Sequence, residues 1–130
     1  MLPEATLPRV TTIKRAIGLI ELRSIARGML TTDAMLKASE VELLRAHVVC
    51  PGKYIILVAG TISQVNSAID TGKQVAPEVV VDHFVLPNVH PSIFPALTAT
   101  TEVDVVKAVG VIETFTLAAS IVAADTAVKA

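Results

Sequence analysis

The most reactive side chain belongs to Cys50, the only cysteine in a chain of 130 residues. Pro51 and Gly52 follow it, and this pair is typical of a turn, because proline restricts φ and glycine frees it. A thiolate can bind a metal, but an iron–sulfur cluster normally needs about four ligands, so one chain cannot hold a cluster alone. A thiol without a metal is the more common fate of a single cysteine. Both interpretations stay open on these residues alone.

The histidines are the other candidate metal ligands, at His47, His83 and His90. Their spacing matches no standard ligand pattern, so we expect ordinary structural histidines. The chain contains no nucleophile elbow, phosphate loop or zinc motif. We therefore predict that it is not an enzyme.

Composition restricts the partners further. Apolar residues make up 52% of the chain, charged residues 18%, and the net charge is −1. A small domain has little interior for so much apolar surface, which favours subunit interfaces. Charged residues interrupt most of the apolar stretches, so we predict no membrane span. Residues 1–15 have no apolar core flanked by a cleavage site, so we predict no signal peptide. Scattered charges and few aromatic residues argue against nucleic-acid binding. The lone cysteine excludes an internal disulfide and fits a reducing cytosol.

The elements that would position these residues are read from periodicity. A short apolar run at 16–22 predicts a buried strand. A helical pattern follows it, with four residues on one face: Ile25, Met29, Thr32 and Leu36. A second helix opens at Thr61, where Gln64 completes capping-box spacing. Its apolar face is Ile62, Val65, Ile69 and Gly72. Further strands are expected at 41–49, 53–59 and 79–86. The order β-α-β-β-α-β predicts an α+β fold of the ferredoxin-like type.

The sequence at the start of this unit is repeated later in the chain. Residues 108–114 repeat 16–22, and the register holds without gaps as far as Ala38 and Ala130. The repeat predicts a tail at 1–14, a first domain at 15–90, a proline-rich linker at 91–105 and a partial second domain at 106–130. A strand and a helix cannot close a core, so the second copy is a fragment of a longer chain or docks on the first. Residues that recur, such as Glu21 with Glu113 and Asp33 with Asp125, indicate scaffold roles.

Four features of this chain resemble the shell domain of bacterial microcompartments, the BMC domain. They are Ala16-Ile-Gly-Leu-Ile-Glu21, Asp33-Ala-Met-Leu-Lys-Ala38, the Pro51-Gly52 turn and Gly60 before the second helix. The resemblance covers about 15–90 and again 106–130, and two copies in one chain resemble the tandem-domain shell proteins. One departure stands at Pro87-Asn-Val-His90, where the family usually has Pro-Arg-Pro-His, and it weakens any inference about edge contacts there.

The resemblance implies a function and several sites. It implies a structural shell subunit that forms flat, pseudohexameric homotrimers, which tile a microcompartment shell in the cytoplasm with other shell proteins. Lys37 would lie at the tile edge, a role that its recurrence as Lys129 favours over a merely solvated lysine. Cys50, Pro51 and Gly52 would form a pore loop. A threefold axis would bring three Cys50 thiolates together, which implies a [4Fe–4S] cluster shared by three chains. Such a cluster would serve electron transfer, with encapsulated redox enzymes as partners, or redox sensing.

One alternative of a different class stays open. Ferredoxin-like domains also serve as regulatory modules that bind a metabolite between subunits, and the predicted fold is compatible with that function. The two hypotheses differ in assembly, because shell proteins form sheets or tubes while a regulatory domain stays a discrete oligomer.

Overall fold

The computed structural model describes residues 16–99 and 101–130. The tail predicted at 1–14 therefore lies outside the described residues. The first unit has the predicted order of strands and helices: β1 (Ala16–Leu22), α1 (Ile25–Ala38), β2 (Glu42–Val49), β3 (Lys53–Gly60), α2 (Ile62–Val75) and β4 (Val80–Leu86), with a 3₁₀ turn η1 (Pro77–Val79) before β4. The ferredoxin-like α+β fold is confirmed.

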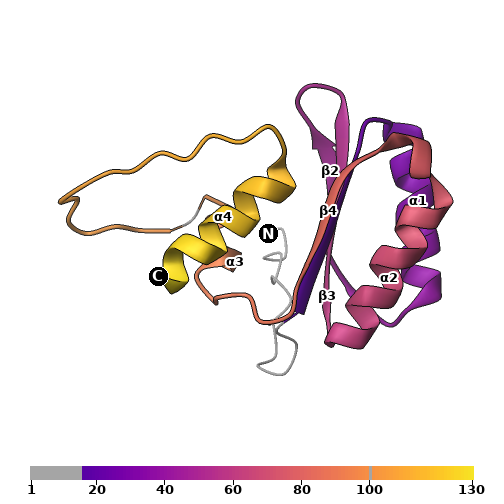
Figure 1. Cartoon of the computed structure of the whole chain (residues 1–130), viewed down its shortest axis with the longest axis horizontal. Helices are drawn as coiled ribbons and strands as arrows, with labels where there is room; N and C mark the ends of the chain where they lie inside the picture. Colours follow the sequence, from indigo (N-terminus) through magenta and orange to yellow (C-terminus); the bar gives the residue numbers. More distant parts are fainter. Residues whose placement is uncertain (1–15, 100) are drawn as a thin grey trace, which may run out of the picture.

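The four strands form one antiparallel sheet in the order β2-β3-β1-β4. Helices α1 and α2 cover one face of this sheet. The other face carries a short helix, α3 (Ile93–Ala96), and the helix of the second repeat, α4 (Leu117–Lys129). Figure 1 shows the sheet nearly edge-on between these two helical layers. The described part of the chain therefore has three layers.

Strand β1 lies at the centre of both cores. Because side chains alternate across a strand, Ile20 and Leu22 pack under α1 and α2, whereas Ile17 and Leu19 pack under α3 and α4. Every residue of β1 is buried. Full burial of a Leu or Ile side chain contributes about 1.5–3 kcal/mol. Both faces of the sheet therefore depend on a helical cover.

The helices begin at residues suited to capping. Ser24 caps α1, and its side chain accepts a hydrogen bond from the backbone N–H of Arg27. The capping box predicted between Thr61 and Gln64 is present at the start of α2, where each side chain accepts from the other residue's N–H. Such caps satisfy N–H groups that have no partner within the helix.

The buried face predicted for α1 is wrong. The helix buries Gly28, Thr31 and Met35 and leaves Met29 58% exposed, with Ile25 and Leu36 also exposed. The ring of Tyr54 lies against Gly28, so closely that a Cβ there would be 2.4 Å from Cδ1 of the ring. Small residues allow this approach of helix to sheet. The stripe of larger apolar residues faces outward.

The face predicted for α2 is largely confirmed. Val65, Ile69 and Gly72 are buried as expected, and Ala68 joins them. Ile62, at the first position of the helix, is 50% exposed. The apolar period therefore located the core face of α2 but not that of α1.

The second repeat forms its helix but not its strand. The strand expected at 108–114 is absent, and Val109 and Val111 are 78% and 87% exposed. In the first unit the equivalent strand β1 is paired on both sides, by β3 and β4. No strand of the described residues lies beside 108–114, so its backbone groups have no ladder to join. The expected linker at 91–105 is partly packed, because Ile93 of α3 is buried in the second core.

We expect Gly28→Val to lower the free energy of unfolding by about 2–3 kcal/mol, because the added atoms overlap the Tyr54 ring. Urea unfolding followed by circular dichroism measures this change. Gly110→Val is the matched control, since nothing lies within 4 Å of a Cβ at that position. Equal midpoints for the two variants would contradict the close packing of α1 on β3.

Candidate functional site

The turn that carries Cys50 connects β2 to β3. Cys50 is a free, exposed thiol, and the Cys50–Pro51 peptide bond is cis. Gly52 adopts φ +67°, in the left-handed region that favours glycine. The predicted turn is therefore present. Figure 1 shows this hairpin projecting at one end of the sheet, away from the helices.

The candidate metal ligands are not brought together. His47 lies on β2 and His83 on β4, which are the two opposite edges of the sheet. Among the described residues, no group of three His, Cys, Asp or Glu side chains could hold a metal ion. His90 follows β4, and its Nδ1 accepts a hydrogen bond from the backbone N–H of Ser92. Within one chain, Cys50 is thus a single thiol donor.

Lys37 lies in the last turn of α1 with a side chain that is 75% exposed. Its Nζ is 2.6 Å from Oδ2 of Asp33, one turn earlier. Lys129 and Asp125 form the same ion pair in α4 at 2.5 Å. The recurrent Asp and Lys of the repeat therefore pair along each helix. The edge role of Lys37 involves a neighbouring molecule and stays a prediction.

The least expected feature is a buried carboxylate on β1. Glu21 is 0% exposed and points to the same face of the sheet as Ile17 and Leu19. Its Oε1 lies 2.5 Å from Nζ of Lys53, and its Oε2 accepts a hydrogen bond of 3.3 Å from the backbone N–H of Ala118. Ala118 is in the first turn of α4, where unpaired N–H groups favour a negative charge. Sequence reasoning assigned Glu21 only a scaffold role; a Glu within an otherwise apolar strand was the available signal.

Polar contacts hold the rest of α4 on the first unit. The Oγ1 of Thr116, the N-cap residue, donates to Oδ2 of Asp82 at 2.5 Å. At the other end of the helix, Oδ1 of Asp125 accepts from the backbone N–H of His90 at 2.7 Å, and Nζ of Lys129 donates to the Asn88 carbonyl at 2.6 Å. These contacts attach both ends of α4 to the first unit, which is the docked arrangement, one of the two possibilities left open for the second copy.

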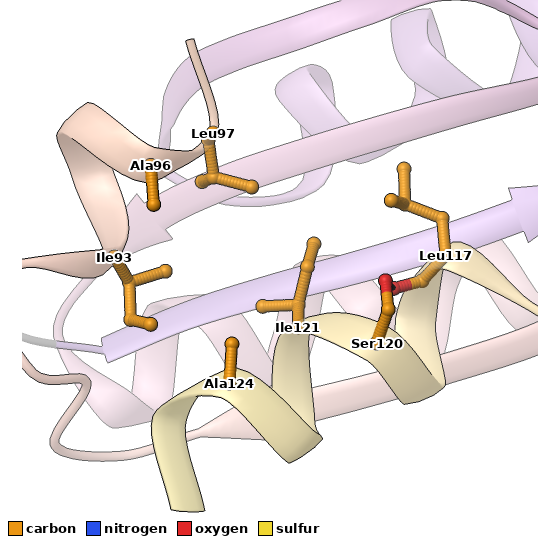
Figure 2. A pocket seen from close by; sticks show the side chains of 7 residues that line it. All are labelled: Ile93, Ala96, Leu97, Leu117, Ser120, Ile121 and Ala124. Atoms are coloured by element: carbon orange, nitrogen blue, oxygen red, sulfur yellow. Dashed lines mark hydrogen bonds between the residues drawn. The ribbon is translucent and has the colours of Figure 1, made fainter. Parts of the chain in front are cut away.

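A shallow cavity of about 260 Å³ lies between α3 and α4. Figure 2 shows the side chains that line it: Ile93, Ala96, Leu97, Leu117, Ser120, Ile121 and Ala124. The hydroxyl of Ser120 already donates to the Leu117 carbonyl. With so few polar groups the cavity offers little to orient a polar metabolite.

The two copies of the repeated helix bury opposite faces. Helix α4 buries Ala118, Ile121 and Asp125. Their equivalents in α1 by the repeat register are exposed: Ala26, Met29 and Asp33. Part of the stripe that was predicted to be buried in α1 is packed in α4: the equivalents of Ile25 and Met29 lie on the sheet, whereas those of Thr32 and Leu36 are exposed. One helical pattern therefore carries two packing faces, one for its own sheet and one for a neighbouring unit.

The contacts of Asp125 perturb its titration. Burial alone would raise the pKa of this carboxyl group. The hydrogen bonds from Lys129 and from the His90 backbone, with the charges of both residues, outweigh burial and hold the pKa of Asp125 below its ordinary value of 3.8. The ionised carboxylate is therefore the form that binds the segment after β4.

Comparison with known proteins places this arrangement in a family. The model of the BMC domain matches residues 16–89. The bacterial microcompartment shell protein PduT of Citrobacter freundii is 48% identical over 118 residues, which cover 91% of this chain and 64% of that protein. The carboxysome shell protein CsoS1A of Hydrogenovibrio crunogenus is 33% identical over 86 residues, covering 64% of this chain and 90% of that protein.

A solved structure agrees with these relatives. A microcompartment protein from Desulfitobacterium hafniense DCB superposes with a TM-score of 0.76 at 54% identity, over 88% of this chain and 63% of that chain. This chain thus spans somewhat less than two thirds of the length of the PduT relative and of this structural neighbour. Among the described residues, no helix has the length and apolar character needed to cross a membrane.

The contacts of Asp125 predict a pH dependence for α4. The pKa of Asp125 is lower in the folded protein than in the unfolded chain. The stabilisation of α4 by the ionised Asp125 carboxylate is therefore complete above the ordinary pKa of 3.8, and it is lost as the pH falls through the lowered pKa. An NMR titration of the His90 amide, which donates to this carboxylate, should show the bond breaking in that range.

Asp125→Asn should loosen α4 already at neutral pH, seen as faster hydrogen exchange of its backbone amides. Asp33→Asn, at the equivalent exposed position of α1, is the matched control and should leave α4 exchange unchanged. The same exchange in both variants would contradict the assignment.

Proposed function

Because the chain belongs to the BMC domain family, we propose that it is a structural subunit of a bacterial microcompartment shell, located with that shell in the cytoplasm. The observation that carries this proposal is the match of the family model to the whole first unit, residues 16–89. The similarity to the PduT shell protein, which extends over 91% of the chain, supports it. By this similarity, the enclosed pathway would be propanediol utilisation.

The named relatives and the cavity beside α4 both favour a structural role over a catalytic or regulatory one. The relatives reported above are named as shell proteins. The cavity beside α4 lacks the convergent polar groups that fix a metabolite in a binding site. The metabolite-binding regulatory domain is therefore not favoured.

Self-assembly would use the exposed stripe of α1. Ile25, Met29 and Leu36 are 39%, 58% and 38% exposed on the outer face of this helix. In α4 the equivalents of the first two, Leu117 and Ile121, pack on the open face of a sheet. We infer that the α1 stripe packs in the same way on the sheet of another unit. In the first unit, α4 already covers the sheet face that lies opposite α1 and α2. The sheet that receives the α1 stripe therefore belongs to another copy of the domain.

Docking of this kind is head-to-tail, because the helix of one unit covers the sheet of the one before it. A head-to-tail contact generates a closed ring when the rotation between units is suitable. Two units per chain and three chains would complete a pseudohexameric homotrimer. The exposed Lys37 then remains at the end of α1 for contacts between tiles and with other shell proteins.

A ring would also change what Cys50 can bind. One thiol cannot hold a cluster, but three equivalent exposed thiols on a threefold axis supply three of the roughly four ligands that a [4Fe–4S] centre requires. The turn fits this use, since nothing lies within 4 Å of a Cβ at Gly52 that would obstruct a bound group. Cys50 would ligate iron, while Pro51 and Gly52 would shape the pore loop. A bound cluster would supply one-electron transfer, toward encapsulated redox enzymes or as a redox sensor.

Shell assembly can be tested by co-expressing this chain, carrying an affinity tag, with the other shell proteins of a propanediol-type microcompartment. Negative-stain microscopy should show the tagged chain in sheets, tubes or closed shells. Met29→Lys, which puts a charge in the α1 stripe, should lower recovery in assemblies about tenfold or more, since an unpaired charge in a packed interface costs several kcal/mol.

Ile62→Lys is the matched control, because Ile62 is similarly exposed but lies on α2, outside the stripe. Recovery only as a discrete oligomer would contradict the shell role. Equal recovery of the two variants would contradict the docking surface alone.

The cluster is tested by anaerobic purification and reconstitution with iron and sulfide. We expect visible absorption and an EPR signal after reduction in the native chain, and loss of both in Cys50→Ser. Circular dichroism should be the same for both proteins, because Cys50 is exposed and packs against no core. A native chain that stays colourless in its assembled form would eliminate the cluster and leave the shell role intact.

A further inference from the structure

We propose that Glu21 and Lys53 link the Cys50 loop to the docked helix of the following unit, so that the loop is less mobile while that helix is seated. The functional meaning of this link rests on the proposed pore role of Cys50. The link itself concerns contacts within one chain. Glu21 and Lys53 act here as positioning residues.

Lys53 stands where the loop meets the sheet. It is the first residue of β3 and follows directly after Gly52. Its side chain lies on the open face of the sheet, is only 18% exposed, and reaches Oε1 of Glu21 at 2.5 Å. Most lysines keep their charged end in water. Here the charged end lies against the sheet instead, so the ion pair with Glu21 restrains the first residue of β3.

The other oxygen of Glu21 faces the helix. Oε2 accepts the backbone N–H of Ala118, so a single carboxylate bridges Lys53 and the first turn of α4. A fully buried carboxylate is costly unless it is paired and hydrogen-bonded. With α4 seated, water is excluded and the ion pair is strong, because attraction between charges grows as the local dielectric constant falls. With α4 displaced, water reaches Glu21 and the pair weakens to that of an exposed salt bridge.

Beyond the backbone ladder of β2 and β3, the loop has few contacts that restrain it. Cys50 is exposed, and nothing lies within 4 Å of the Cβ position of Gly52. The ladder between β2 and β3 ends at the pair Val49 and Lys53. A restraint on the Lys53 side chain therefore acts directly at the base of the loop. In a ring of units, each Cys50 would be positioned once the next unit is docked.

The single cysteine provides the probe. A nitroxide attached to Cys50 reports the mobility of the loop by continuous-wave EPR. In Lys53→Met the rotational correlation time of the label should fall by about twofold or more, on the nanosecond scale of loop motion. Lys73→Met, which removes a lysine from the exposed pair with Asp70, is the matched control and should leave the spectrum unchanged. Lys53→Arg should restore most of the immobilisation.

A second variant approaches the link from the helix. Ile121→Asp places a charge in the core under α4 and should release the helix, while the core under α1 and α2 stays intact. We expect the label to become as mobile as in Lys53→Met. The double variant should be no more mobile than either single one.

Two results would overturn the proposal: a label in Lys53→Met with the mobility of the native chain, or additive effects of the two substitutions. Neither result bears on the shell role, which the assembly experiment tests separately. If Lys53→Met fails to fold, Ile121→Asp alone decides, because an unchanged spectrum with α4 released excludes the link.

Discussion

The structure depends on the need to cover an apolar sheet on both faces. Strand β1 is buried along its whole length and contributes side chains to two cores. Helices α1 and α2 supply one cover. The second cover comes from outside the first unit, as α3 and α4 (Figure 1). A domain that leaves half of its core to the next repeat cannot be stable alone to the same degree. Dependence of each unit on its neighbour is thus built into the fold.

The repeated helix can cover both kinds of sheet face, because one side of it packs on the sheet of its own unit and the other side packs on the sheet of a neighbouring unit. Small residues such as Gly28 allow α1 to approach its own sheet, where the Tyr54 ring covers them. Larger residues on the other side, with Ile121 as the example in α4, fill the open face of a neighbouring sheet. A helix that is apolar on two sides is buried between two partners. The high apolar content of the chain, 52%, follows from this arrangement.

Glu21 is the exception within this apolar framework. It lies in the interior because it is neutralised by Lys53 and hydrogen-bonded to the start of α4. Replacing such a buried pair by apolar residues is often neutral for stability. A pair of this kind can instead specify how two units meet. It also joins that interface to the loop that carries Cys50.

Local patterns in the sequence determined the order of the elements. Strand periodicity, the Thr61–Gln64 capping box and the Pro51-Gly52 turn all depend on neighbouring residues, and all are present in the structure. The repeat that aligns α1 with α4 was readable as well, because it is a match between two stretches of sequence and requires no knowledge of contacts. The buried face of α1, the missing strand at 108–114 and the role of Glu21 were not. Each depends on which distant segment lies alongside: Tyr54 against Gly28, no partner strand for Val109, and the N-terminus of α4 above Glu21. Periodicity shows that a face is apolar, but only the tertiary structure decides what covers it.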